Sequence, residues 1–304
     1  MRDVENLSSR AFGACEKGLE LFNIQLMWRK CNRTPAGRVL AAVFACLGPV
    51  TAQGHGDVHE AILMISKEIE AKPGNAGLLC ERALLYSQAE HYPEALADLA
   101  KADEADPAND TPTAMRGRIF RSTGKLAEAR AAQEAFLKKH PAHAQVRFDY
   151  CLTLVDLKDN PAAIRELDAL ISTSPQPPPD AAAIRLRLTE AQGAGGPAAA
   201  LEWVKVFLTK HPLPVFEEHA LRLEIQLGRT AAAVQRLDAM IAKAPRPESF
   251  WLRKAEVLAA AGDKAGATAA ARAAGEAINR LPAHIRGTGA CTALEQRVQK
   301  ILSP

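Results

Sequence analysis

The fold is decided by the stretch Tyr86-Ser87-Gln88-Ala89-Glu90-His91-Tyr92-Pro93-Glu94-Ala95-Leu96. Before it, residues 78–86 carry apolar side chains at helical spacing, which predicts a first helix. Residues 90–93 predict a turn, and Pro93 stands at the start of a second helix, where no N–H is needed. Ala95, Leu99 and Ala102 then form the apolar stripe that meets the first helix. The stretch therefore predicts a helix-turn-helix unit in which alanine permits a close crossing.

This unit recurs along the chain with a period of 34 residues. The period is marked by two series of residues, Ala61, Ala95, Ala129 and Ala163, and Pro73, Pro107, Pro141 and Pro175. Both series then shift together, through Ala200 with Pro212 and Ala233 with Pro245, and the alanine returns at Ala267. A repeat of this length cannot bury its apolar face alone, so the sequence predicts an all-α solenoid of stacked units.

These residues resemble the tetratricopeptide repeat family. The quoted stretch, followed by Ala102 and Asp106-Pro107, is similar to the family signature, and the next unit carries Gly117, Phe120, Gly124, Ala129 and Pro141 at matching places. Gly195, Gly228 and Gly262 match the turn between helices of later units. The usual aromatic residue early in the first helix is Leu79 and Thr113 here, and is present only as Trp251. The resemblance covers about residues 57–282 and implies a right-handed superhelical solenoid, while implying little about chemistry.

The expected organisation has five parts. Residues 1–26 are interpreted as a gene-start extension and residues 27–52 as a signal peptide, followed by a half repeat at 53–75 that lacks a first helix. Six repeats are expected over 76–282, with the proline-rich insertion 176–180 between two of them. Residues 283–304 are expected to form a linker and an amphipathic helix that caps the open end of the stack.

The N-terminal region predicts an export signal. Residues 27–38 are basic, residues 39–50 are mostly apolar, and Val50-Thr51-Ala52 places small residues before a cleavage point. The apolar run is shorter than the roughly 20 residues that span a bilayer. We expect cleavage near Ala52 and a periplasmic or secreted protein; a retained anchor, a buried helix and lipidation at Cys46 are the alternatives.

Charge and cysteine content exclude some functions for the processed chain. Removing residues 1–52 takes away seven Lys or Arg and four Asp or Glu, so that 31 of each class are left. A balanced chain has no net charge to attract nucleic acid or anionic lipid, and no integral membrane span is expected after cleavage. Cys80, Cys151 and Cys291 are an odd number without paired spacing, so no disulfide framework is predicted.

No catalytic site or cofactor is predicted. The chain has no phosphate-binding loop, serine elbow or paired zinc motif. His55 and His59 are spaced for one helical face but make an incomplete metal site, and Asp57 between them is better interpreted as a helix cap. A processed Gln53-Gly54-His55 terminus is a weak copper or nickel hypothesis. The expected protein is therefore neither an enzyme nor, by the leading hypothesis, a metal protein.

The resemblance implies that function lies on the concave surface, where first helices hold peptides or partner helices. By register this surface includes Arg118, Arg121, Phe148, Asp149, Arg185, Gln192, Arg222 and Gln226. Its arginines are suited to acidic side chains or a terminal carboxylate, although ordinary solvated arginines explain the pattern equally well. Members that clamp a terminal carboxylate use Lys and Asn where this chain has Cys80, Leu84, Ala114 and Arg118, so that activity is not expected.

Three functional hypotheses follow. The first is an extracytoplasmic adaptor that binds a protein or peptide partner on the concave surface. The second is a structural subunit that associates with copies of itself, and the third is an enzyme or a metal carrier. The sequence leaves the partner, the pathway and the oligomeric state open.

Overall fold

The computed structural model describes residues 56–303, and all of its regular structure is helical. The helix α3 (Gly56–Ala71) comes first. Six antiparallel pairs follow: α4 (Ala76–Gln88) with α5 (Tyr92–Ala105), α6 (Thr111–Ser122) with α7 (Leu126–Lys139), α8 (Ala144–Asp156) with α9 (Asn160–Thr173), α10 (Pro179–Glu190) with α11 (Gly196–Lys210), α12 (Pro214–Gln226) with α13 (Thr230–Lys243), and α14 (Glu248–Ala260) with α15 (Lys264–Asn279). The predicted all-α helical-repeat solenoid is confirmed.

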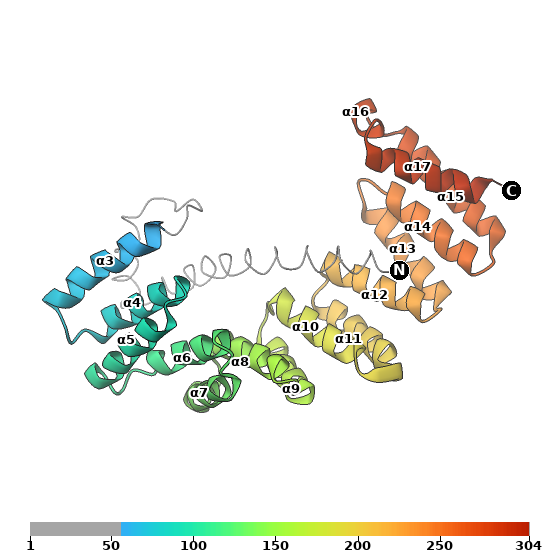
Figure 1. The fold of residues 1–304 in the computed structure, drawn as a ribbon. Coiled ribbons are helices and arrows are strands. Elements are labelled where there is room, and N and C mark those ends of the chain that lie inside the picture. Colours follow the sequence, from blue (N-terminus) through green and yellow to red (C-terminus); the bar gives the residue numbers. More distant parts are fainter. Residues whose placement is uncertain (1–55, 304) are drawn as a thin grey trace.

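The pairs stack side by side into an open arch (Figure 1). The first helices α6, α8 and α10 lie along the inner side of the arch, and their partners α7, α9 and α11 lie outside. Each second helix packs against the first helix of its own pair and, where another pair follows, against that of the next, so the described residues are not built around a single central core. This arrangement presents the first helices as one continuous inner surface.

The repeated alanines are buried where the helices of each pair cross. Their exposed fraction is at most 2% in all six pairs, at Ala95, Ala129, Ala163, Ala200, Ala233 and Ala267. In the first pair, Leu99 and Ala102 are equally buried against Leu79 and Ala83 of α4. The small side chain at the crossing allows the backbones to approach closely, which is why the period of the sequence is also the period of the structure.

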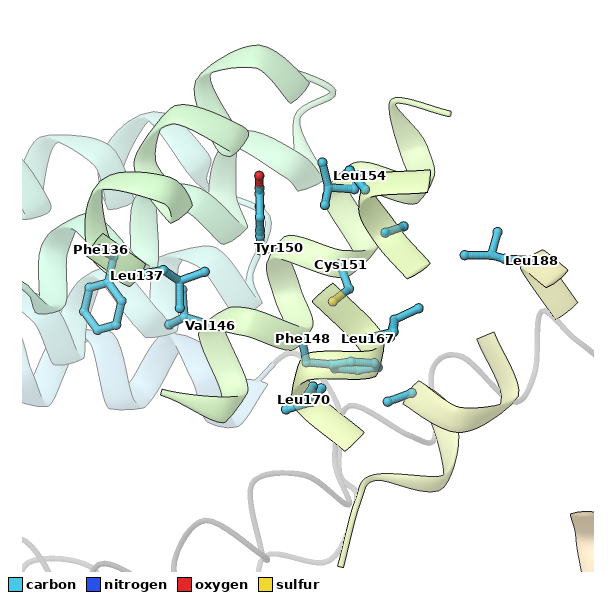
Figure 2. Close-up of a cluster of buried hydrophobic side chains, with 13 residues drawn as sticks. Phe136, Leu137, Val146, Phe148, Tyr150, Cys151, Leu154, Leu167, Leu170 and Leu188 are labelled. Atoms are coloured by element: carbon cyan, nitrogen blue, oxygen red, sulfur yellow. The ribbon is translucent and has the colours of Figure 1, made fainter. Parts of the chain in front are cut away.

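The apolar core continues from one pair to the next without interruption near α8. Figure 2 shows Phe148, Leu167 and Leu170 gathered between α8 and α9, with Phe136 and Val146 extending the cluster toward α7. Leu188 of α10 belongs to the same cluster, so it spans three successive pairs. Burial of this continuous apolar surface is the main force that holds the stack together.

Each pair turns through one residue with a positive φ. Gly124, Gly228 and Gly262 have φ values of 74°, 66° and 84°. In the fourth pair Gly195 does lie in the turn, where it closes the short 3-10 helix η1 (Gly193–Gly195), but the positive φ, of 67°, belongs to Gly193. The turn from α10 to α11 is longer than the others, so the residue with the positive φ lies two positions before Gly195 in the chain.

The C-terminal end is closed by two helices rather than a plain linker and one helix. The helix α16 (Ala283–Arg286) forms within the stretch expected as a linker, because Pro282 accepts hydrogen bonds from Ile285 and Arg286 and starts a turn. The helix α17 (Gly289–Leu302) then packs on α15 and α14 and buries Cys291 and Val298. The expectations for residues 1–52, including the signal peptide, Cys46 and the Ala52 cleavage site, fall outside the described residues, as does His55.

Candidate functional site: the inner face of the first helices

The inner stripe is the row of side chains that the first helices present to the inside of the arch. It is continuous at helical spacing on α12, where it consists of Val215, Glu218, Arg222 and Ile225. Stepping back by the repeat places Leu84 of α4, Arg118 of α6 and Leu152 of α8 in equivalent positions. A predicted site residue can contact a partner inside the arch only if it lies on this surface.

Ion pairs connect successive first helices along this stripe. Arg121 of α6 donates to Asp156 of α8 at 2.6 Å, and Arg253 of α14 donates to Glu218 of α12 at 2.6 Å. Arg222 of α12 makes two bonds, of 2.7 and 2.6 Å, to the Glu190 carboxylate of α10. The predicted arginines are therefore already matched by carboxylates of the neighbouring repeat, and they link the repeats as well as facing the arch interior.

Arg118 is the least constrained of the predicted arginines on the inner stripe. Its side chain is 55% exposed, and its Nε lies 3.7 Å from Oδ2 of Asp149, beyond hydrogen-bond distance. That oxygen is buried and has no hydrogen-bond partner among the described residues, while Oδ1 accepts a 3.3 Å bond from Gln145. Burial raises the pKa of the Asp149 carboxyl, opposed by the nearby Arg118. Arg118 is thus the cation best placed to bind an acidic group of a partner.

Arg222 is held more firmly. Its hydrogen bonds lower the pKa of Glu190, and the same contact raises the pKa of the Arg222 guanidinium. Gln226, one turn further along α12, is exposed and accepts a long 3.4 Å bond from Arg222. A ligand would have to displace an existing bidentate pair here, so this position is better suited to organising the surface than to capturing an anion.

Phe148 is not on the inner surface, contrary to prediction. It is a buried member of the cluster in Figure 2. The equivalent residues one and two repeats earlier are Ala114 and Cys80; Cys80 is likewise buried in a core cluster, and Ala114 packs against the cluster that contains Phe148. Phe148 therefore stabilises the stack and is not available to a partner.

Arg185 is also misplaced by the prediction. It binds Asp168 of α9 through Nε at 2.8 Å, and its guanidinium lies 4.7 Å from the centre of the Trp203 ring of α11. Counting back from Ala200 shifts the register by two residues, because the turn that contains η1 is longer than the others. Counted from the positive-φ residue of each turn, Arg187 and not Arg185 is equivalent to Arg118 and Arg222, and Gln192 lies past the end of α10, exposed in the turn.

The prediction missed the apolar part of the stripe. Leu84, Val215 and Ile225 are half of the six large hydrophobic side chains that the described residues expose. The position of Leu84 follows from the sequence, because Leu84 stands 34 residues before Arg118, but the predicted site residues were mainly charged and polar. The inner stripe therefore combines exposed apolar side chains with an incompletely paired arginine, which is the composition of a protein-binding surface.

The described residues contain no group of three or more His, Cys, Asp or Glu placed to hold a metal ion. Cys80 and Cys151 are buried, and burial raises the pKa of their thiols to about 11 and about 12, which makes them poor nucleophiles. From residue 56 to residue 303, none of the helices combines the length and apolar character needed to cross a bilayer.

Comparison with known proteins agrees with the repeat architecture. A family model described as tetratricopeptide repeat matches residues 114–181 and 220–279. No curated protein matches the chain.

Several solved structures are similar to the chain. A tetratricopeptide repeat protein from Parabacteroides merdae ATCC 43184 is 15% identical, with a TM-score of 0.46 over 80% of this chain and 93% of that one. Pseudomonas aeruginosa PilF is 17% identical, with a TM-score of 0.41 over 74% and 96% of the two chains. A chain of the Naa15/Naa10 complex bound to HypK-THB is 15% identical, with a TM-score of 0.49; the match spans 82% of this chain and 37% of that one.

The family model supports tetratricopeptide repeats at residues 114–181 and 220–279, and the repeat period and the paired helices agree with it.

Proposed function

We propose that this chain is a non-catalytic extracytoplasmic scaffold that binds a protein or peptide partner on the inner stripe. The observation that carries the proposal is the exposure of Leu84, Val215 and Ile225 on the same surface as Arg118. Exposed apolar side chains gain free energy when a partner covers them, and Arg118 adds a preference for an acidic group beside them. Tetratricopeptide repeats bind protein partners, which agrees with this composition.

The test is affinity capture from the envelope fraction of the source cells with variants of the inner stripe. We expect Leu84→Asp, Val215→Asp and Ile225→Asp in one chain to abolish capture of the partner while leaving the fold intact, because all three side chains are already exposed. Val206→Asp is the matched control, since Val206 is equally apolar, 62% exposed and on the outer helix α11. Equal capture by the triple variant and the control would refute binding at the inner stripe.

The extracytoplasmic location is part of the proposal and rests on the layout of residues 27–52. The protein isolated from its source should begin at Gln53 by intact mass. A mass that begins at residue 1 would refute both the signal peptide and the gene-start extension.

Self-association is the second candidate, because α3 exposes the adjacent Leu63 and Met64 at the end of the stack. It predicts a mass in solution that rises with protein concentration in sedimentation velocity. A constant monomer mass across the accessible concentrations would eliminate it.

A further inference from the structure

Within the described residues, which start at Gly56, α3 is the counterpart of a second helix, and no first helix precedes it there. By the 34-residue period, Ala61, Met64 and Ile65 are equivalent to Ala95, Asp98 and Leu99 of α5. Those three residues of α5 are at most 3% exposed, because α4 covers them. In α3, Ala61 and Ile65 are only half-buried, and Met64 is 57% exposed. We call Ala61, Met64, Ile65 and Glu68 the open face of α3.

The repeat predicts which kind of element would cover the open face of α3. All six complete pairs cover this face of the second helix with a helix, and they do so over a buried alanine at the place of Ala61. The other side of α3 packs on the α4–α5 cluster through Ile69, and Ile65, at the edge of the open face, also packs against that cluster. A helix that crosses close to Ala61 therefore completes the unit in the geometry of its neighbours.

The N-terminal part of the chain, which contains α3, is rich in acidic residues, although Asp98, Asp103 and Asp110 are ion-paired. Residues 53–110 contain 12 Asp or Glu and only 4 Lys or Arg, whereas residues 111–304 contain 19 and 27. The balanced total of the processed chain thus conceals a negative N-terminal part, so the absence of net charge does not mean the absence of a local field.

The carboxylate of Glu68, on the open face, repels that of Glu81 on α4. Burial raises the pKa of Glu81 on α4, and Glu68 on α3 raises it further. Neither side chain forms an ion pair with another described residue. A cation brought here would find two carboxylates without a counter-charge.

We infer that the open face of α3 binds an amphipathic helix with basic flanks, supplied by a partner protein. The helix would place an apolar residue against Met64, where α4 uses Arg82 against Asp98, and lysine or arginine next to Glu68 and Glu81. The inference rests on the proposed cleavage after Ala52, which removes the basic and apolar residues 27–50 of this chain. A second copy bound through its own α3 would bring two acidic regions together, so a basic partner helix is favoured.

The test uses a defined peptide and the full chain as isolated. The probe is a synthetic helix with the α4 sequence, carrying Arg82→Leu, Glu81→Lys and added lysines at its solvent positions. We expect saturable binding by fluorescence anisotropy that weakens as salt is raised, with no binding of the same peptide carrying glutamates in place of the lysines. Met64→Glu should weaken binding at least tenfold, whereas Leu63→Glu should leave it unchanged, because the equivalent residue of α5, Ala97, is exposed to solvent.

Three results would overturn the inference. The first is no binding at millimolar peptide, and the second is binding that Met64→Glu leaves intact. The third is occupation by this protein itself, seen as a dimer that Met64→Glu dissociates or as a cross-link from residues 27–50 of an unprocessed chain to α3. Variants of Leu84, Val215 and Ile225 should bind the peptide normally, so this test and the inner-stripe test fail independently.

Discussion

The two halves of the solenoid are built from the same unit but are finished differently. At the C-terminal end, α17 buries Cys291 and Val298, and Arg297 holds Glu256 of α14 through both carboxylate oxygens. Its outward residues Gly289, Ala293 and Lys300 are small or charged. At the N-terminal end, α3 leaves Leu63 and Met64 in solvent. One end is therefore closed by a polar cap, whereas the other end presents an unfinished apolar face.

The N-terminal half also contains local features that cost stability. Gln133 is fully buried in α7, and neither amide atom of its side chain has a hydrogen-bond partner among the described residues. Glu90 adopts a φ of 62° in the turn where Gly228 and Gly262 serve the later pairs. Both features are unfavourable. We therefore expect the N-terminal half to unfold before the C-terminal half. Its exposed apolar surfaces are among those that we propose bind partners.

The largest effect should come from destroying the cap. Val298→Asp places an unpaired charge in a position that is 2% exposed, so we expect a loss of about 3–5 kcal/mol in urea unfolding. Met64→Asp is the matched control at the open end and should change stability by only about 0.5 kcal/mol. Similar losses for the two variants would mean that the open face of α3 is covered in the free protein.

A smaller effect, of opposite sign, is expected from Gln133→Leu. The equivalent residues Leu99, Leu167 and Leu237 are all fully buried leucines, so the leucine has a place to pack. Removing the two unpartnered amide atoms should raise the free energy of unfolding by about 2 kcal/mol. Hydrogen exchange should slow in α6 and α7 specifically, and a destabilised variant would contradict the assignment of Gln133 as an unfavourable core residue.

Substitutions at the positive-φ residue should have opposite effects on stability in two equivalent turns, the one between α4 and α5 and the one between α6 and α7. Glu90→Gly relieves a left-handed glutamate and should gain about 1 kcal/mol, whereas Gly124→Glu, at the equivalent position, should lose about 1 kcal/mol. Thermal unfolding of the two variants measures both changes. If they share the same sign, the backbone of the two turns is not equivalent.

The smallest expected effect is the pH dependence of Glu81→Gln. The folded pKa of Glu81 is raised, so its ionised form destabilises the native state above the unfolded pKa, and acidification relieves this cost. The glutamine variant should be more stable than the wild type at pH 7 by a few tenths of a kcal/mol, with the difference vanishing toward pH 4. A difference that grows on acidification would reverse the sign we assign.

The sequence predicted the architecture well because the repeat is enforced by packing at every period. A close helix crossing needs a small residue, and this need recurs every 34 residues, as at Ala95 and Ala129. The structure buries the crossing alanine of all six pairs. Register extrapolated over a regular turn also assigned Arg118, Arg121 and Arg222 to first helices, and they lie in α6 and α12.

The errors arose where local geometry departs from the period. The longer turn around Gly193 shifts the register at Arg185, and the position of Phe148 faces the core, as that of the equivalent Cys80 does. The pairing of Arg222 with Glu190 was also hidden, because the sequence gives a residue's register but not the neighbour that its side chain contacts across repeats.

The central claim is that partners bind the inner stripe. Hydrogen–deuterium exchange of the chain with and without its captured partner tests this claim most directly. We predict slower exchange in α4, α6, α8 and α12, with little change in the outer helices α7, α9 and α11. Protection confined to the outer helices would contradict the account.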